Sequence, residues 1–439
     1  MGFAMIELLS PAGNFEKLKS AVLFGADAVY CSGKMFGMRS AADNFTVEEL
    51  FAAGRYVHEH GKKLYLTVNT MPHEDEYAIL RRYLESLRGA EIDAMIVADL
   101  GAFALIREIL PEMEIHVSTQ ASVVSSASAK AYAALGAKRV VLARELTLEE
   151  IGKIRADLDP AVELEVFIHG SMCVSWSGRC LLANAMGGRD GNRGTCTQPC
   201  RWNYHLIEEK RPGAAIPVEE TDLGTFIMSS KDLCMIEHIP ELVQSGVTSL
   251  KIEGRMKSAY YTAVVTNTYR MALDAYLRDP GSYRYDPAWL EELESVSHRE
   301  YGTGFFFTGP MQDPQLVSVC GYLREKAYFS MATEYHEEEM EVLRAAGIAE
   351  ENEDGRLYRF MQRNKLTAAE EAELVAPGKV GQPFVARELY APDGSVLEST
   401  PHPSMIYWCR VPYQVREGNI LRAATSKGLE VRPPEKARF

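Results

Sequence analysis

The sequence predicts an α/β protein, with a (β/α)8 TIM-barrel-like domain that carries a cysteine-rich insertion and is followed by a small C-terminal β domain. Eight short apolar runs alternate with segments of helical spacing through residue 253, which is typical of parallel strands joined by helical crossovers. One long interval interrupts this alternation, and after about residue 319 the pattern changes to short strands with turn signals. An open, doubly wound sheet is the alternative.

The apolar runs mostly lack a regular alternation of polar and apolar residues, as expected for strands buried on both faces. They span residues 6–9, 28–31, 64–69, 94–99, 115–120, 140–144, 164–169 and 249–253. Helical spacing is found at 14–24, 46–58, 74–87, 101–110, 123–135, 148–158 and 257–277. Thr46, three residues before Glu49, predicts a capping box at the start of the second helix.

The interruption defines an insertion, residues 170–248, within a catalytic domain at 1–318. It begins at the carboxyl end of the seventh strand, the end at which barrel enzymes carry their active sites. Loops of this length are uncommon unless they are functional. Residues 319–439 are predicted to form a small β-barrel-like domain, with an acidic helix and loop at 334–354.

Composition limits the class of protein. The 439 residues are 46% hydrophobic and 25% charged, which is ordinary globular usage. A net charge of −14 argues against a general nucleic-acid binder, although a specific RNA site needs only a local basic field. The start of the chain does not resemble a signal peptide, and no run of about 18 apolar residues is present, so a cytoplasmic protein without a membrane span is expected.

Four of the eight cysteines crowd into the insertion, with six, fifteen and three residues between them. They are Cys173, Cys180, Cys196 and Cys200. Four thiolates can close a zinc site or hold an iron–sulfur cluster. The Cys-x-x-Cys pairs of zinc ribbons are absent, which leaves a [4Fe–4S] cluster and zinc both open, beside free cysteines or disulfides. The other four cysteines are scattered and are expected to be small core residues.

Between residues 170 and 211 there are six basic and three acidic residues, opposite to the balance of the whole chain. Arg189, Arg193 and Arg201 lie close in sequence to Trp176 and Trp202. Arginines with interleaved aromatic residues can hold an RNA backbone while a ring stacks on an unpaired base. A solvated face over core aromatic residues is the alternative interpretation.

Polar residues end several predicted strands and would ring one mouth of a barrel. They are Asn69, Asp99, Gln120, Arg144, His169 and Glu253. Lys251, Glu253 and Arg255 alternate, which predicts that they share one side of their strand. We expect Arg144, Lys251 and Arg255 to bind a small carboxylate, and His169 and Glu253 to be the catalytic groups. A purely structural ring is the alternative.

Sequence signatures of hydrolases are absent. There is no His-Glu-x-x-His motif and no Gly-x-Ser-x-Gly elbow. Cys173 and His169 could form a thiol dyad, but that would leave the other three clustered cysteines without a role.

Several motifs resemble the collagenase-like peptidase family of unknown catalytic type, peptidase family U32. They are ELLSPAGN at 7–14, GADAVY at 25–30, FIHGSMC at 167–173, SGRC at 177–180 and KIEGR at 251–255. The stretch NRGTCTQPCRW at 192–202 is similar to the tRNA hydroxylase branch of that family. The resemblance covers residues 6–310 well and continues more weakly into the C-terminal domain.

The resemblance implies a barrel-like enzyme that hydroxylates the wobble uridine of tRNA to 5-hydroxyuridine and depends on prephenate. It implies an iron–sulfur cluster ligated at the positions of Cys173, Cys180, Cys196 and Cys200, with Cys234 as an alternative fourth ligand. The expected partners are a tRNA anticodon loop and a small carboxylate co-substrate. A collagenase-like peptidase, and an iron–sulfur partner in another hydroxylation pathway such as ubiquinone synthesis, remain alternatives.

Overall fold

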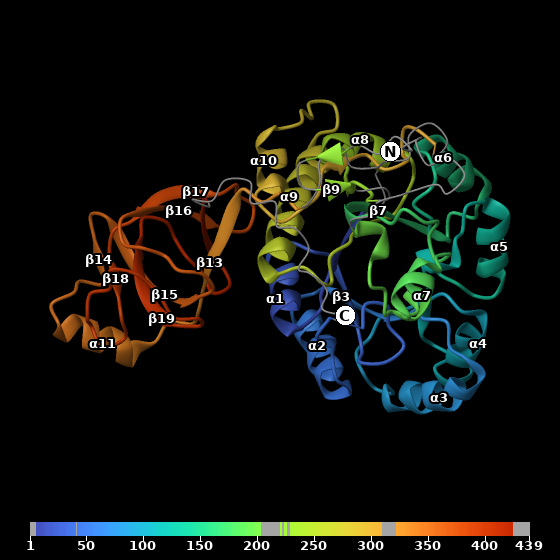
Figure 1. The fold of residues 1–439 in the computed structure, drawn as a ribbon, viewed down its shortest axis with the longest axis horizontal. Helices are drawn as coiled ribbons and strands as arrows, with labels where there is room; N and C mark the ends of the chain where they lie inside the picture. Colours follow the sequence, from blue (N-terminus) through green and yellow to red (C-terminus); the bar gives the residue numbers. More distant parts are fainter. Residues whose placement is uncertain are drawn as a thin grey trace.

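The computed structural model describes residues 6–40, 42–202, 229–309 and 322–424, together with the backbone of 220–221 and 224–225. An α/β barrel and an antiparallel β domain lie side by side (Figure 1). The predicted fold class is confirmed. The predicted domain boundary at 318/319 lies outside the described residues.

Eight parallel strands form the barrel. They are β1 (Glu7–Pro11), β2 (Ala28–Ser32), β3 (Lys63–Val68), β4 (Ala94–Val97), β5 (Glu114–Val117), β6 (Arg139–Val141), β7 (Glu163–Ser171) and β11 (Ser249–Ile252). They pair in this order, and β11 pairs with both β1 and β7, which closes the sheet. All eight predicted strands are confirmed, and the open-sheet alternative is wrong.

Helices surround the strands (Figure 1). They are α1 (Phe15–Leu23), α2 (Val47–Glu59), α3 (Tyr77–Ser86), α4 (Leu100–Ile109), α5 (Ser126–Ala134), α6 (Leu148–Asp157), α8 (Ile239–Gln244) and α9 (Ala259–Arg278). Two short 3-10 turns, η1 (Glu74–Glu76) and η2 (Thr119–Ala121), precede α3 and follow β5. The capping box of Thr46 and Glu49 is confirmed. None of the helices in the described ranges has the length and apolar character to cross a bilayer.

The insertion leaves β7 and returns to β11. Its elements are α7 (Leu182–Gly187), η3 (Gly191–Arg193), η4 (Pro199–Arg201), β8 (Glu220–Thr221), β9 (Gly224–Thr225), β10 (Asp232–Cys234) and η5 (Ile236–His238). Strand β10 runs antiparallel to β7 and parallel to β12 (Tyr301–Gly302), so the end of the insertion extends the barrel sheet.

The C-terminal domain is built on an antiparallel sheet. Its elements are β13 (Lys326–Ala332), α11 (Glu337–Ala345), β14 (Glu351–Asn352), β15 (Gly355–Gln362), β16 (Glu370–Val375), β17 (Gln382–Ala386), β18 (Leu389–Tyr390), β19 (Ile406–Val411) and β20 (Ile420–Ala424). The predicted acidic helix and loop correspond to α11 and β14. Arg422 of β20 bonds Glu292 of α10 (Ala288–Glu294) at 2.6 Å and Glu373 of β16 at 2.7 Å, which ties this domain to the barrel.

A buried ion network fills the barrel interior beneath the carboxyl-terminal mouth, towards the amino-terminal ends of the strands. Arg139 Nη1 lies 3.0 Å from Glu165 Oε2 and 2.5 Å from Glu7 Oε1, and Lys251 Nζ lies 2.7 Å from Glu165 Oε1. Burial alone would raise the pKa of Glu165, but Lys251 and Arg139 outweigh it and lower the pKa to about 2. The network joins β1, β6, β7 and β11, the strands at which the barrel closes.

We predict that Glu165→Gln destabilises the barrel by about 3–5 kcal/mol at pH 7, because it leaves Lys251 and Arg139 buried without their counter-charge. In the native chain the carboxylate contributes stability above the unfolded pKa of about 4.3, and this contribution is lost as the pH falls towards 2. Thermal unfolding from pH 7 to pH 3 measures both effects. The variant should be less stable at pH 7 and show a weaker loss at low pH, whereas the exposed control Glu149→Gln should behave as the native chain.

Candidate active site

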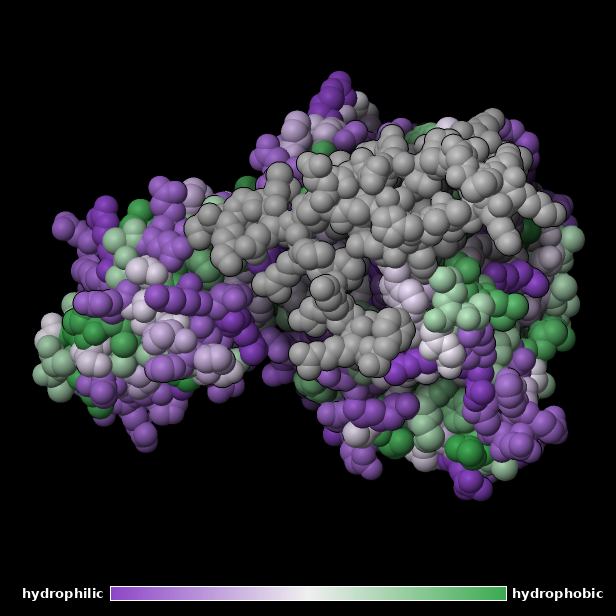
Figure 2. Space-filling view, viewed as in Figure 1, coloured by the Kyte–Doolittle hydropathy of each residue, from purple (hydrophilic) through white to green (hydrophobic). Residues whose placement is uncertain are grey.

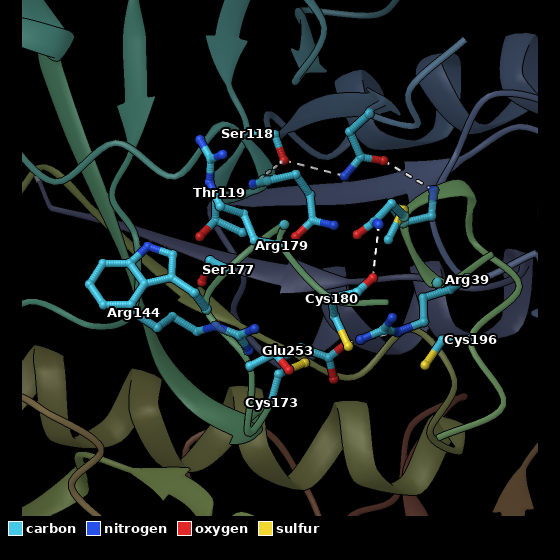
Figure 3. Close-up of a pocket in the computed structure, with 18 of the residues that line it drawn as sticks. Arg39, Ser118, Thr119, Arg144, Cys173, Ser177, Arg179, Cys180, Cys196 and Glu253 are labelled. Carbon is cyan, nitrogen blue, oxygen red and sulfur yellow. Dashed lines mark hydrogen bonds and ion pairs between the residues drawn. The ribbon is translucent and has the colours of Figure 1, made fainter. Parts of the chain in front are cut away.

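A cavity of about 140 Å³ lies at the carboxyl-terminal mouth of the barrel (Figure 3). Its walls are side chains from the ends of the barrel strands, from the connection after β2 and from the insertion. The position is the one at which barrel enzymes hold their active sites.

All four clustered cysteines line this cavity, and all are free thiols. Cys173 and Cys196 are exposed, whereas Cys180 and Cys200 are half-buried. Four thiols around one space are the donor set of a four-iron cluster, in which each thiolate binds a different iron. As placed, no three His, Cys, Asp or Glu side chains in the described ranges gather closely enough to hold a single metal ion.

Cationic side chains favour the thiolate form of Cys173. Cys173 is exposed to the cavity, and partial desolvation there would raise the pKa of its thiol, but the guanidinium groups of Arg144, Arg39 and Arg201 outweigh this effect and lower the pKa. At Cys200 burial prevails and raises the pKa above its usual value. The thiols of the cavity therefore differ in how readily they ionise before any ligand binds.

Backbone contacts hold the start of the cysteine segment on the barrel. Arg144 Nη1 donates to the carbonyl oxygen of Ser171 at 3.0 Å, and Arg299 Nη2 donates to that of Met172 at 3.3 Å. Arg299 is in turn fixed by Asp232 of β10 through a buried contact of 2.7 Å. Cys173 thus follows a stretch of chain whose position the barrel determines.

A second anchor joins the insertion to η2. Gly178 has a φ of +74°, and a Cβ atom there would lie 2.2 Å from the carbonyl oxygen of Gln120. Ser122 Oγ donates to the Ser177 carbonyl oxygen, and the Ser177 amide donates to Glu145 Oε1 at 2.8 Å. The close approach requires glycine at position 178.

Lys251, Glu253 and Arg255 all line the cavity, as their alternation predicts. Two of them are already bonded to protein groups, because Lys251 pairs with Glu165 and Arg255 donates to Thr67 Oγ1 at 3.4 Å and to the carbonyl of Met38. The cavity floor is therefore largely satisfied before a ligand enters.

Sequence reasoning missed Arg39, which lines the cavity beside the cysteines (Figure 3). Its Nε atom lies 3.7 Å from Glu253 Oε1, and its φ of 69° is in the left-handed region that non-glycine residues rarely adopt. The available signal was the long connection from β2 to α2, because long loops at the carboxyl end of barrel strands commonly serve the active site.

His169 does not line the cavity. It is buried against Tyr269 and Tyr301, with ring centroids 5.5 and 5.4 Å away, and burial lowers its pKa to about 3. The strand register shifts between Lys251 and Ile252, so the alternation that puts Glu165 and Phe167 inside the barrel does not continue to His169. The structure therefore brings Glu253 into the cavity but not His169.

The predicted RNA-contacting residues separate into two groups. Trp176 lines the cavity and is 44% exposed, and Arg189 is exposed on the same insertion. Arg193 pairs with Glu76, and Arg201 donates to Gln198 Oε1 at 2.6 Å. Figure 2 shows an apolar surface over α7, and the exposed large apolar side chains of this region are Trp176, Leu181 and Met186. Arg179, which is exposed and lines the cavity, was also missed.

Comparison with known proteins gives the following matches. Peptidase family U32 matches residues 13–315, and the peptidase family U32 C-terminal domain matches residues 344–422. "tRNA hydroxylation protein P1" of Bacillus subtilis is 36% identical over 95% of this chain and 94% of its own. "Uncharacterized protease MJ0090" of Methanocaldococcus jannaschii is 46% identical over 69% of this chain and 73% of its own. "23S rRNA 5-hydroxycytidine C2501 synthase" of Escherichia coli is 36% identical over 67% of this chain and 44% of its own.

We predict that Gly178→Ala releases the cysteine segment from the barrel, because its Cβ cannot coexist with the Gln120 carbonyl. Gly188→Ala is the matched control, since Gly188 also has a positive φ of +60° but has no atom within 4 Å of a built Cβ. Limited proteolysis should cleave the insertion of the Gly178 variant faster than that of the control. Equal cleavage rates would show that this contact does not hold the insertion.

Proposed function

Since this chain belongs to peptidase family U32, we propose that it is an iron–sulfur tRNA hydroxylase. Its reaction would convert the wobble uridine of an anticodon loop to 5-hydroxyuridine, with prephenate as co-substrate. The observation that carries the proposal is the cavity itself, in which four thiols, cationic side chains and an exposed tryptophan meet at the barrel mouth. The similarity to tRNA hydroxylation protein P1, over nearly the whole chain, supports tRNA as the substrate.

The cluster ligands in this proposal are Cys173, Cys180, Cys196 and Cys200. Cys234 is not among the residues that line the cavity, is buried on β10 and contacts Tyr269 Oη at 3.9 Å, which favours the other four. A [4Fe–4S] cluster held there supplies one-electron transfer. The neighbouring guanidinium groups favour the ionised thiol of Cys173, the form that binds iron.

The cationic lining supports an anionic co-substrate. Arg39, Arg144 and Arg179 line the cavity together with Lys251 and Arg255, and Glu253 is the acidic side chain among the lining residues. Glu165, which is buried in the barrel interior, neutralises the charge of Lys251. Guanidinium groups bind carboxylates through paired hydrogen bonds, so the remaining positive charge suits a carboxylate such as prephenate. Arg39 and Arg179 extend the predicted set of Arg144, Lys251 and Arg255.

An unpaired base is the part of a tRNA that such a cavity can accept. Anticodon bases are single-stranded, so little energy is needed to turn one out of the stack. Trp176 stands exposed at the cavity wall and can stack on a base or close the pocket over it. Arg179 and Arg189 on the same insertion are placed to contact loop phosphates.

A peptidase is the second candidate, favoured by the family description and by the name of the M. jannaschii relative. A cysteine peptidase needs a histidine beside its thiol. His169 lies among tyrosines outside the cavity, so it does not form a dyad with Cys173 in this structure. A third candidate is an iron–sulfur partner protein in another hydroxylation pathway, such as ubiquinone synthesis, and the experiment below separates it from the first.

We predict that anaerobically purified protein contains iron and, with prephenate present, adds one oxygen to the wobble uridine of tRNA. Iron analysis, the visible absorbance spectrum and mass spectrometry of tRNA nucleosides measure this. The double variant Cys196→Ser, Cys200→Ser should lose the cluster spectrum and the modification, and Cys234→Ser should keep both. Stoichiometric zinc without iron, an iron-loaded protein that never modifies tRNA, or cleavage of peptides would each contradict the proposal.

We also predict that the insertion contacts RNA. Trp176→Ala should weaken tRNA binding by roughly ten- to a hundredfold, because stacking on a base is worth about 1–3 kcal/mol. Arg179→Glu combined with Arg189→Glu should weaken it further at low salt. Arg88→Glu is the control, since Arg88 is exposed between α3 and β4, at the opposite end of the barrel. Filter binding measures these affinities, and unchanged binding in the tryptophan and arginine variants would refute the RNA surface.

A further inference from the structure

The side chain of Gln120 differs in its hydrogen bonding from the other carboxamides that line the cavity. Among the described residues, three carboxamides line this space: Asn69, Asn192 and Gln120. Asn69 accepts from the Met38 amide at 3.1 Å and donates to Ser118 Oγ at 3.4 Å, and Asn192 donates to the Cys180 carbonyl at 2.9 Å. The Gln120 carboxamide makes no hydrogen bond with any part of the chain that the structure describes.

The backbone that carries this side chain is fixed. The Gln120 amide donates to Ser118 Oγ at 3.3 Å, and the Ala121 amide donates to the Ser118 carbonyl at 2.9 Å. Gly178 of the insertion packs against the Gln120 carbonyl, so η2 cannot shift towards the cysteines. A free donor and acceptor are therefore presented from a rigid support, which is the arrangement that gives specificity to a binding site.

Charged and uncharged groups both lie near Gln120. Figure 3 shows its chain neighbours Ser118 and Thr119 on the same side as Arg179, and opposite Arg144, Glu253 and Cys173. Guanidinium groups suit a carboxylate, whereas an uncharged carboxamide offers one donor and one acceptor to a neutral partner. Base edges carry such paired donors and acceptors, and glutamine and asparagine are the side chains that read them through two hydrogen bonds.

We infer that Gln120 binds the base at this site along the N3 and position-4 edge of a pyrimidine. This inference rests on the proposed function and deepens it. For uridine, the Gln120 carbonyl oxygen accepts from N3–H and its amide donates to O4. Cytidine presents the reverse pattern, an acceptor at N3 and a donor at N4, so the carboxamide must turn over to pair with it. Trp176 supplies the ring face while Gln120 supplies the edge contact.

The test uses two substitutions with different consequences. Gln120→Glu removes the donor that O4 of uridine requires and keeps an acceptor for N3–H. Gln120→Met keeps the length of the side chain and removes both functions. Gln382→Glu in the C-terminal sheet is the matched control for added charge, because Gln382 lies on β17, outside the residues that line the cavity.

The measurements are binding of two anticodon stem-loop RNAs that differ only in uridine or an abasic site at the wobble position, and hydroxylation of the uridine RNA, with iron content recorded for every variant. Gln120→Met should lose roughly ten- to a hundredfold in the binding preference for the uridine RNA over the abasic RNA, the size of one paired base contact. Gln120→Glu should lose part of that preference, and Gln382→Glu should match the native chain. A merely structural role would weaken binding of both RNAs equally in Gln120→Met.

An unchanged uridine-to-abasic binding ratio in Gln120→Met overturns the inference. If Gln120→Met loses iron, the binding data of Gln120→Glu decide, and native affinity for the uridine RNA in that variant overturns it. A native protein that binds the uridine RNA without modifying it refutes the proposed hydroxylation, while the binding ratio still tests Gln120. A native protein that binds neither RNA refutes both.

Discussion

The buried carboxylate of Glu165 is the interaction on which the rest of the structure depends. It lies between Arg139 of β6 and Lys251 of β11, and Arg139 also reaches Glu7 of β1. A barrel closes only where its last strand meets its first, and this network joins the strands on both sides of that contact. Charges buried in this way are costly unless they are paired, so the pairing also restricts which closed arrangement is stable.

The same network shapes the cavity above it. Lys251 Nζ lies 4.5 Å from the ring centroid of Tyr30 and 5.4 Å from that of Phe167, and all three residues line the cavity. Glu165 neutralises the charge of Lys251, whereas Arg255 bonds only neutral groups and keeps its charge. The positive charge that remains for a ligand is that of the arginines that line the cavity. The barrel interior thus determines which cations are available to an anion.

The alternation of apolar runs predicted all eight strands because burial on both faces leaves a local signature, and the period of two placed Lys251, Glu253 and Arg255 together. Two other features could not be predicted from the sequence. A register shift near Lys251 keeps His169 out of the cavity, and Arg193 forms its ion pair with Glu76, which is distant in sequence. No local pattern encodes either. Gln120 differs from the neighbouring carboxamides because, within the described part of the chain, they are already hydrogen-bonded and it is not. Only the three-dimensional structure reveals this difference.

Different elements of the fold carry the cysteines and the Gln120 side chain of the cavity. The cysteines belong to the insertion, whereas Gln120 belongs to η2, a barrel loop, and the two elements meet where Gly178 packs against the Gln120 carbonyl. A change of side chain at position 120 can therefore alter this wall of the cavity without replacing a thiol. Barrel enzymes diverge in this manner, because each strand end contributes its own loop to a shared mouth.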